Sequence, residues 1–436
     1  MKSNNKAFEL LGDKVKSREA VISIIGLGYV GLPLALEFVE SGFEVIGFDT
    51  DKVKVNNLKK NKTYIEHISS SKIKKAISKS FFPTTDFKKI KKTDFIILCV
   101  PTPLNKQREP DLKYIEETLD TISPYLKEHQ CISLESTTYP GTTEQLIATE
   151  IAKLGFKIGH DFYVIYSPER EDPGNKEFII QQIPKVVSGI SKNCLHIAEL
   201  VYGSVFESVI KVSNTRTAEM TKLLENIFRS VNIGLVNEMK KISDKMNINI
   251  HEVIKAAETK PFGFTAFYPG PGIGGHCIPI DPFYLTWKAK EYGVNTKFIE
   301  LAGEINAEMP QYVIDKATEI LNLHRKTVKG SKILILGIAY KKNVDDMRES
   351  PAVIIMEKLR KMGALINYHD PHVKKFPKMR EHNFDLKSIK LNKFNISKYD
   401  LVILTTDHDQ VDYKFIKSNA KLIVDTRGVY MKKNNK

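Results

Sequence analysis

Residues 21–31 read VISIIGLGYVG and decide the fold of this chain. The first five residues form an apolar, β-branched run, which is typical of a buried parallel strand. Gly26, Gly28 and Gly31 follow directly, and a helical pattern then extends from about residue 33 to residue 41. A GxGxxG between a strand and a helix predicts a dinucleotide-binding loop. Its glycines provide a tight turn, close approach of a pyrophosphate, and packing of the helix on the strand. A glycine turn that serves only packing is the alternative.

A second strand is expected at residues 43–48, and Asp49 ends it. A carboxylate roughly 20 residues after a glycine loop is placed to accept hydrogen bonds from the ribose hydroxyls, which favours NAD over NADP. Lys54 lies just beyond Asp49 and could contact the adenosine end of the cofactor, so NADP stays open.

The rest of the chain alternates between apolar runs and helical stretches. Apolar runs at residues 95–100, 131–134 and 162–166 continue the first series of strands. Further runs open a second series, at residues 332–337, 364–370, 401–404 and 422–425. Such alternation predicts doubly wound parallel sheets. The second series keeps only Gly337 of a glycine triplet, so we expect it to bind a different nucleotide.

Between the two series the pattern is helical. Apolar residues recur at helical spacing from about residue 214 to residue 246, which predicts one long helix. More helices are expected up to about Glu308, with a boundary at Met309-Pro310. The expected fold class is therefore α/β: two Rossmann-like, doubly wound parallel-sheet domains joined by a helical domain with a long central helix.

Composition narrows the function classes. The chain has 436 residues and a net charge of +14, but its lysine clusters lie apart and lack interleaved aromatic residues. We therefore expect a solvated basic surface that attracts anionic nucleotides, and no nucleic-acid partner. The four cysteines form neither a disulfide framework nor a metal site, which suits a cytoplasmic location. We expect no signal peptide, and no membrane span, because the uncharged residues 20–36 are too short and carry Gly and Pro.

A second loop, GGHCIPID at residues 274–281, places Cys277 between a glycine pair and a proline. Asp281 follows four residues later. Glycine and proline shape a loop, where catalytic groups concentrate, so Cys277 is a candidate nucleophile. A buried cysteine that acts as a small hydrophobic residue is an equal alternative from this segment alone.

Six motifs at ordered spacing carry a resemblance to a known family. Besides the glycine loop and the cysteine loop, they are STTYPGTT at 136–143, SPEREDPG at 167–174, ExxKxxxN at 219–226 and YKKxxxDxRES at 340–350. The chain resembles the UDP-glucose/GDP-mannose dehydrogenase family over nearly its whole length. The resemblance implies an NAD-binding domain at 1–210, a central domain with the catalytic loop and a dimerisation helix at 211–320, and a UDP-sugar-binding domain at 321–436.

The resemblance also implies a reaction, the four-electron oxidation of a sugar C6 alcohol to a carboxylate. Two NAD are consumed and the aldehyde stays bound. Cys277 resembles the nucleophile that holds the aldehyde as a thiohemiacetal and then as a thioester. The other catalytic residues implied are Lys222 and Asn226 for oxyanion stabilisation, Asp281 for proton transfer through water, Glu169 as base for thioester hydrolysis, and Thr137 to position the water.

The resemblance implies two further sets of residues. Those expected at the cofactor are Gly26, Gly28, Tyr29, Val30, Gly31, Asp49, Lys54, Thr102 and Arg348. Those expected at the substrate are Arg170, Lys222, Gly274, Lys341 and Arg427. Structural or surface ion pairs are the alternative for the charged members. No metal site is expected.

One departure bears on the sugar. UDP-glucose dehydrogenases usually follow Ser-Pro-Glu with Phe-Leu and a second glutamate, whereas residues 170–175 here are REDPGN, with Pro173 at the position of that acid. This resembles the branch that acts on UDP-N-acetylhexosamines, chiefly UDP-N-acetylglucosamine, in the synthesis of surface polysaccharide or glycan precursors. UDP-glucose and UDP-N-acetylmannosamine stay open, as do a single-step hydroxyacid dehydrogenase and a non-catalytic NAD-binding regulator. A homodimer or higher oligomer through the central helix is expected.

Overall fold

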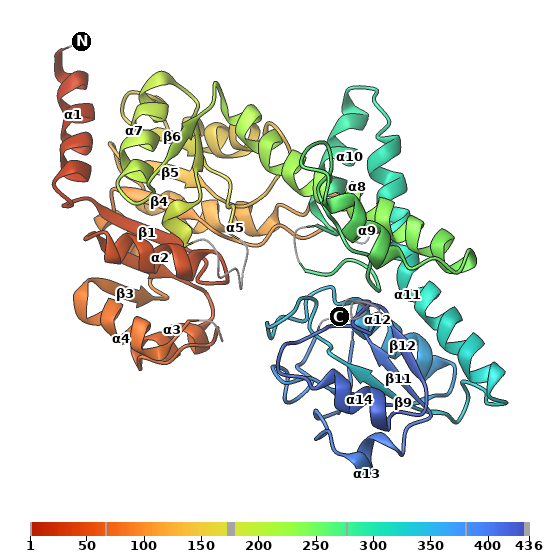
Figure 1. Ribbon diagram of the computed structural model, residues 1–436. Helices are drawn as coiled ribbons and strands as arrows, with labels where there is room; N and C mark the ends of the chain where they lie inside the picture. Colours follow the sequence, from red (N-terminus) through yellow and green to blue (C-terminus); the bar gives the residue numbers. More distant parts are fainter. Residues whose placement is uncertain are drawn as a thin grey trace. The chain divides into compact units, whose positions relative to one another are not determined.

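In the computed structural model of the protein, the described residues are 2–65, 68–105, 107–171, 179–275, 278–379 and 382–430 (Figure 1). The chain forms two compact units. The first consists of residues 1–225 and 283–294, and the second of residues 226–282 and 295–436.

The first unit is built on an eight-stranded sheet in the order β3-β2-β1-β4-β5-β6-β7-β8. Its strands are β1 (Val21–Ile25), β2 (Glu44–Phe48), β3 (Phe81–Thr84), β4 (Phe95–Leu98), β5 (Cys131–Leu134), β6 (Tyr163–Tyr166), β7 (Lys185–Gly189) and β8 (Val209–Lys211). The first six strands are parallel, as expected, but β7 runs antiparallel to β6 and β8 parallel to β7. The doubly wound parallel sheet is thus confirmed over six strands, and the antiparallel pairing of β7 was not expected. Three short strands were not predicted: β3, β7 and β8. Strand β3 was missed because it contains Pro83, which argues against a strand in the sequence. β3 lies at the edge of the sheet, where a proline is tolerated.

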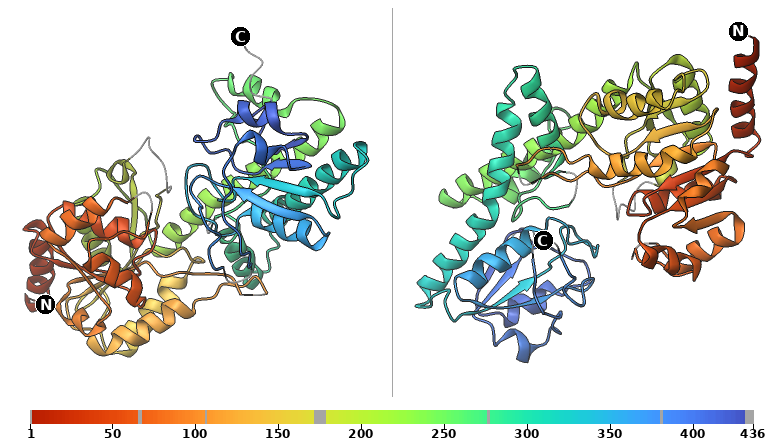
Figure 2. Two further views of the ribbon diagram at one scale, coloured as in Figure 1. Left: turned by 90° about the horizontal axis from the view of Figure 1, so that it is seen from below. Right: turned by 180° about the vertical axis from the view of Figure 1, so that it is seen from behind.

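Helices cover both faces of this sheet (Figure 2). They are α1 (Lys2–Lys16), α2 (Gly31–Glu40), α3 (Lys52–Lys59), α4 (Ser70–Lys79), η1 (Phe87–Lys92), α5 (Lys113–Ile122), η2 (Ser123–Tyr125), η3 (Thr143–Ala148), α6 (Thr149–Lys153), η4 (Ile180–Gln182) and α7 (Lys192–Gly203). Because side chains alternate along a strand, Ile24 packs with α2 and α7, whereas Ile25 packs with α5 on the opposite face.

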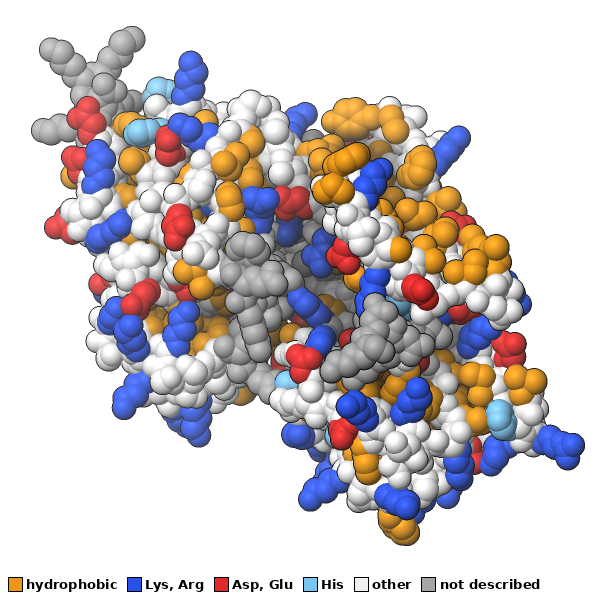
Figure 3. Space-filling view, in the orientation of Figure 1, with side chains coloured by type: hydrophobic (Ala, Val, Ile, Leu, Met, Phe, Trp, Pro, Cys, Tyr) orange, Lys and Arg blue, Asp and Glu red, His pale blue; other side chains and the backbone are white. Residues whose placement is uncertain are grey.

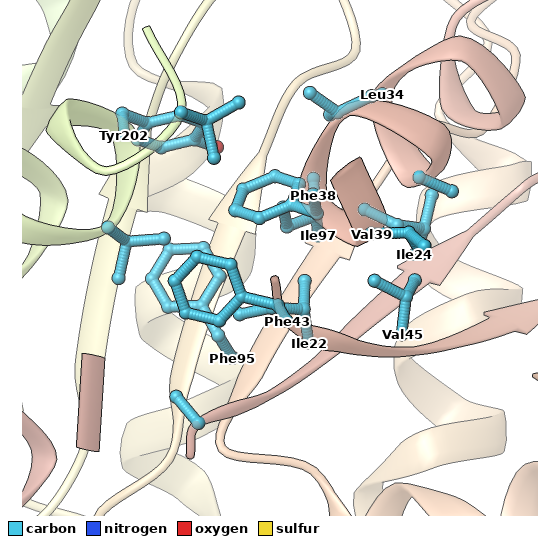
Figure 4. Close-up of a cluster of buried hydrophobic side chains, with 14 of the residues drawn as sticks. Ile22, Ile24, Leu34, Phe38, Val39, Phe43, Val45, Phe95, Ile97 and Tyr202 are labelled. Atoms are coloured by element: carbon cyan, nitrogen blue, oxygen red, sulfur yellow. The ribbon is translucent and has the colours of Figure 1, made fainter. Parts of the chain in front are cut away.

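Aromatic side chains dominate the core beside α2 and α7. Figure 4 shows Phe38, Phe43 and Phe95 close to Ile22 and Tyr202 at another side of the same cluster, and all are buried. Their rings meet at tilted or edge-on angles, with the Phe38 and Phe43 centroids 5.8 Å apart. Each buried aromatic side chain contributes about 1.5–3 kcal/mol from removal of its apolar surface from water. This packing fixes the strand that leads into the glycine loop.

The expected long helix is confirmed as α8 (Thr215–Lys245), followed by α9 (Ile250–Glu258), α10 (Asp281–Glu291) and α11 (Lys297–Leu323). The break expected at Met309-Pro310 is wrong, because α11 continues through both residues. A proline removes one backbone hydrogen bond from a helix, but Met309, Pro310 and Val313 are all buried, so packing keeps the helix intact.

The second unit contains a four-stranded parallel sheet in the order β10-β9-β11-β12. Its elements are β9 (Lys332–Leu336), α12 (Pro351–Lys361), β10 (Leu365–His369), α13 (Lys393–Ile396), β11 (Leu401–Leu404), α14 (Tyr413–Asn419) and β12 (Ile423–Asp425). Helices α11 and α12 pack on one face, and α13 and α14 pack on the other. This is the second α/β unit that the sequence predicts.

Two features of the whole chain bear on its partners. Among the helices in the described ranges, none has both the length and the apolar character needed to cross a membrane. Lysine and arginine side chains are spread over the face seen in Figure 3 and do not gather in one patch.

Candidate functional site

The glycine loop of the first unit has two glycines that packing requires and one that it does not. Gly26 has a φ of 95°, and a Cβ there would lie 2.5 Å from the carbonyl oxygen of Cys99. A Cβ at Gly31 would overlap the carbonyl oxygen of Gly26. At Gly28, by contrast, a Cβ would meet nothing within 4 Å. Packing alone therefore does not explain Gly28, and the open space beside its backbone fits a pyrophosphate at the start of α2.

Asp49 holds this loop from the end of β2. Its Oδ2 accepts a hydrogen bond from the backbone N–H of Leu27 at 3.0 Å, and its Oδ1 accepts one from Asp51 at 2.8 Å. Lys54 Nζ lies 3.4 Å from Oδ2, so the lysine expected near the adenosine end forms an ion pair with this carboxylate. Tyr29 and Val30 are half-buried within the loop. The residues present fit the adenosine side of an NAD molecule.

Thr102 connects two expected parts of the site. Its hydroxyl donates a hydrogen bond to the backbone carbonyl of Thr137 at 2.8 Å. We expect Thr102 at the cofactor and Thr137 at the hydrolytic water. The two residues follow neighbouring strands, β4 and β5. Parallel strands bring their carboxyl ends to one edge of the sheet, where ligands bind in open α/β folds.

Glu219 on α8 fastens the STTYPGTT segment. Its carboxylate is buried and accepts hydrogen bonds from the N–H of Gly141 at 2.5 Å and from the N–H and hydroxyl of Thr143 at 2.9 and 2.7 Å. Burial raises the pKa of Glu219 to about 7, although the three hydrogen bonds favour the ionised form. The sequence motif included Glu219, but no role was predicted for it.

Glu169 is half-buried beyond the end of β6 and is held by α8. Lys222 Nζ donates a hydrogen bond to the backbone carbonyl of Glu169, and the N–H of Glu171 donates one to its carboxylate. Arg170 forms an ion pair with Glu225 at 2.7 Å, also on α8. The structure therefore joins the predicted lysine, the predicted base and the start of the segment on which the expectation about the sugar rests.

Sequence reasoning missed a buried group beneath Glu169. Lys185 at the start of β7 lies 2.6 Å from Glu135 and 3.9 Å from Glu169, and Tyr202 donates to Glu135. The available signal was a charged residue next to each of two apolar runs. Lys185 directly precedes Val-Val, and Glu135 directly follows residues 131–134.

In the second unit, Asn226 and Asp281 meet. Asn226 Nδ2 donates to Asp281 Oδ2 at 2.6 Å, and both side chains are buried, with exposures of 4% and 2%. Lys222 and Asn226 are one turn apart on α8. Cys277 lies outside the described residues.

The glycines before Cys277 pack on the loop that follows β9. A Cβ at Gly274 would lie 2.6 Å from the Cβ of Tyr340, and the N–H of Gly275 donates to the carbonyl of Arg348 at 2.9 Å. Gly274, assigned to the substrate, is thus also needed for packing. The cysteine loop and the YKKxxxDxRES segment meet within this unit.

The basic residues expected in this unit differ in their contacts. Arg348 forms a two-pronged ion pair with Asp346 at 2.6–3.0 Å. Arg427 donates to the carbonyl of Thr405 at 2.8 Å, and burial lowers its pKa. Lys341 is half-buried. In the ranges that the structure describes, no group of three or more His, Cys, Asp or Glu side chains could hold a metal ion.

Comparisons with known proteins agree along the whole chain. Residues 20–206 match the NAD binding domain of the UDP-glucose/GDP-mannose dehydrogenase family, residues 216–308 its central domain, and residues 334–432 its UDP binding domain. Protein CapL of Staphylococcus aureus is 35% identical over 94% of this chain and 96% of its own length.

Two other relatives differ in the sugar they are named for. The UDP-N-acetyl-D-glucosamine 6-dehydrogenase of Salmonella typhi is 34% identical over 90% of this chain and 91% of its own. The structure of a UDP-D-ManNAc dehydrogenase from Pyrococcus horikoshii superposes with a TM-score of 0.83 at 30% identity, covering 93% of this chain and 95% of that one. The expected α/β fold and the NAD cofactor are confirmed, and the chain belongs to the UDP-glucose/GDP-mannose dehydrogenase family.

Proposed function

We propose that this enzyme oxidises the C6 hydroxyl of a UDP-N-acetylhexosamine to the carboxylate, with UDP-N-acetylglucosamine as the first candidate. Family membership over three domains supports the reaction class. The observation that carries the proposal is the buried Asn226–Asp281 pair, because it sets an amide and a carboxylate beside the loop of Cys277. A uronic acid product suits the synthesis of a surface polysaccharide.

The first oxidation needs groups that remove a proton and stabilise an oxyanion. Bound NAD supplies a hydride acceptor. Asp281 acts with Lys222 through water to take the hydroxyl proton, and Lys222 and Asn226 donate hydrogen bonds to the oxygen at C6. The Asn226 amide is oriented for this by its hydrogen bond to Asp281.

The second oxidation proceeds on the enzyme. The Cys277 thiolate adds to the aldehyde carbon. The resulting thiohemiacetal becomes a thioester by giving up its hydroxyl proton and one hydride, for which a second NAD would be the acceptor. Glu169 removes a proton from a water held near Thr137, the water adds to the thioester carbon, and the carbon–sulfur bond breaks. Cys277 is regenerated, and the uronic acid leaves.

The identity of the sugar is tested by a panel of UDP-sugars with NAD, scored as NADH formed per sugar. UDP-N-acetylglucosamine should give two NADH per sugar at the highest kcat/KM, with UDP-N-acetylmannosamine and UDP-glucose below it. Cys277→Ala should abolish turnover, because the aldehyde then has no covalent partner. One NADH per sugar, or full turnover by Cys277→Ala, contradicts the covalent mechanism.

We also propose that the enzyme is a cytoplasmic homodimer. Helix α8 bears exposed apolar side chains spaced by three, four or seven residues, a pattern that places them along one face. They are Met220, Leu224, Phe228, Leu235, Met239 and Ile242. Figure 3 shows hydrophobic side chains gathered on the part of the surface that α8 forms. A monomer at micromolar concentration in analytical ultracentrifugation would exclude this dimer.

A further inference from the structure

A charged side chain lies in the interior of the first unit, next to the proposed hydrolytic base. The Lys185 side chain is only 3% exposed. Its ammonium lies 2.6 Å from Glu135 Oε2 and 3.2 Å from the carbonyl oxygen of Pro168, and 3.9 Å from Glu169 Oε2. One buried cation therefore faces two carboxylates and the backbone that carries the second of them.

The remaining contacts of this cluster fix Glu135. Tyr202 donates its hydroxyl hydrogen bond to Glu135 Oε1 at 2.5 Å and lies 2.8 Å from the Ser133 hydroxyl. The rings of Tyr202 and Phe206 flank the ammonium at 5.3 and 5.4 Å. Glu135 is thereby held on both oxygens, and its position determines that of Lys185.

Stability does not account for such a cluster. Removing two charges from water costs several kcal/mol for each ion, and a well-packed apolar replacement of a buried ion pair is often equally stable or more so. The strands β7 and β5 carry no other charged side chain and could pack without any charge. A role at the neighbouring site explains the charge better.

Two lysines donate hydrogen bonds to consecutive backbone carbonyl groups at the site. Lys185 binds the carbonyl of Pro168, and Lys222 binds the carbonyl of Glu169. The Glu169 carboxylate has one oxygen bonded to the N–H of Glu171 and the other facing Lys185. The orientation of this carboxylate thus depends on Lys185.

We propose that Lys185 is a positioning residue that, anchored by Glu135 and Tyr202, holds the Glu169 carboxylate aimed for removal of a proton from the hydrolytic water. The inference rests on the proposed role of Glu169 in thioester hydrolysis.

The titratable groups around the cluster determine how it responds to pH. Those facing Lys185 are Glu135 after β5, Glu169 after β6, Tyr202 on α7 and Cys99 after β4. Glu171 lies beside Glu169, and Glu37 on α2 and Lys72 on α4 act in turn on Glu171. Loss of the Lys185 charge removes a cation 3.9 Å from the Glu169 carboxylate, so it should move the acid limb of hydrolysis to higher pH. Loss of the Glu135 charge leaves Lys185 to act more strongly on Glu169, and moves that limb to lower pH.

The test compares Lys185→Met and Glu135→Gln in the full-length enzyme, with UDP-N-acetylglucosamine and NAD. Lys185→Met should keep the first burst of two NADH per active site, but its steady-state rate should fall roughly 10- to 100-fold. Intact-protein mass spectrometry should then show the acylated enzyme. The acid limbs of kcat should shift in opposite directions in the two variants, which a merely structural role does not produce.

Matched variants separate the possible outcomes. Lys211→Met on β8 removes an exposed lysine paired with Glu199 at 2.7 Å and should match the wild type. Glu169→Gln should stall as the acyl enzyme, and if it hydrolyses normally, the proposed function of Glu169 fails and this inference with it. If Glu169→Gln stalls while folded Lys185→Met hydrolyses at the wild-type rate, only the role of Lys185 is overturned. Should Lys185→Met not fold, Glu135→Gln decides, and an unshifted acid limb overturns the inference.

Discussion

At the scale of single residues, the three glycines of residues 26–31 have separable roles. Gly26 and Gly31 have backbone neighbours where a side chain would stand, whereas Gly28 faces open space. The sequence pattern assigns these roles by analogy, and the geometry of this chain supports the division. A substitution at Gly28 therefore tests cofactor binding, and a substitution at Gly31 tests packing of the loop.

Gly31→Ala should destabilise the first unit by roughly 1–3 kcal/mol, because the added methyl group overlaps the carbonyl of Gly26. Gly28→Ala should unfold as the wild type does, but its affinity for NAD should fall at least about tenfold, because the methyl group occupies the space beside the backbone. Thermal unfolding and NAD titration followed by fluorescence measure the two effects. Wild-type NAD affinity in Gly28→Ala would show that this space is not used.

At the scale of elements, α8 is the support for the site. It carries Glu219, which fastens the segment after β5, Lys222, which holds Glu169, and Asn226, which pairs with Asp281. Three polar groups on one helix at intervals of three and four residues therefore each fix a different loop. A long amphipathic helix was predictable, but the partners of its polar residues were not.

Glu219→Ala should lower the free energy of unfolding by roughly 3 kcal/mol, because the buried N–H groups of Gly141 and Thr143 lose their acceptor. Unfolding of the first unit in urea measures this loss of free energy. The control is Glu238→Ala, which removes an exposed carboxylate of the same helix and should change stability by less than about 0.5 kcal/mol. Equal stability of the two variants would rule out the anchoring role.

The same carboxylate should make stability depend on pH. Its pKa is about 7 when folded, above the ordinary value of 4.5, so the folded state keeps a proton that the unfolded state loses. The contribution of Glu219 is then complete below pH 4.5 and declines as the pH rises through about 7. Glu219→Gln cannot titrate, so the stability of the wild type relative to this variant should fall over that interval. A constant difference in urea unfolding across the interval contradicts the raised pKa.

At the scale of the whole molecule, both sheets have a glycine turn after one strand and an aspartate after the neighbouring strand, but the two aspartates lie in different environments. Gly337 turns after β9 with a φ of 76°, as Gly26 does after β1, and Asp370 after β10 accepts from the N–H of Ile338 at 2.7 Å, as Asp49 does from Leu27. Asp370, however, is fully buried and also bonded to His408. Burial alone would raise its pKa, but His408 and backbone N–H groups hold it at about 2.

These environments predict different effects of one substitution. Asp49→Asn should raise the KM for NAD by roughly tenfold or more, because the ribose loses a charged acceptor, and should also lower the thermal midpoint of the first unit, because the amide keeps only one of the two oxygens that accept backbone N–H groups. Asp370→Asn should lower the thermal midpoint of the second unit, because His408 loses its charged partner, while the KM for NAD stays as in the wild type. Steady-state kinetics and calorimetry measure both. A raised KM for NAD in Asp370→Asn would indicate a second dinucleotide site.

The sequence by itself determined the strand–glycine–helix unit of residues 21–31, the long helix and the second α/β unit, because each depends on periodicity and glycine geometry within a short segment. Only the tertiary structure decided the reversal at β7, the unbroken course of α11 through Pro310, and the partners of Glu219, Asn226 and Lys185. The hydrogen bonds of Glu219, Asn226 and Lys185 join residues 50 or more positions apart. Such pairs form through packing of the whole unit, and local sequence does not specify them.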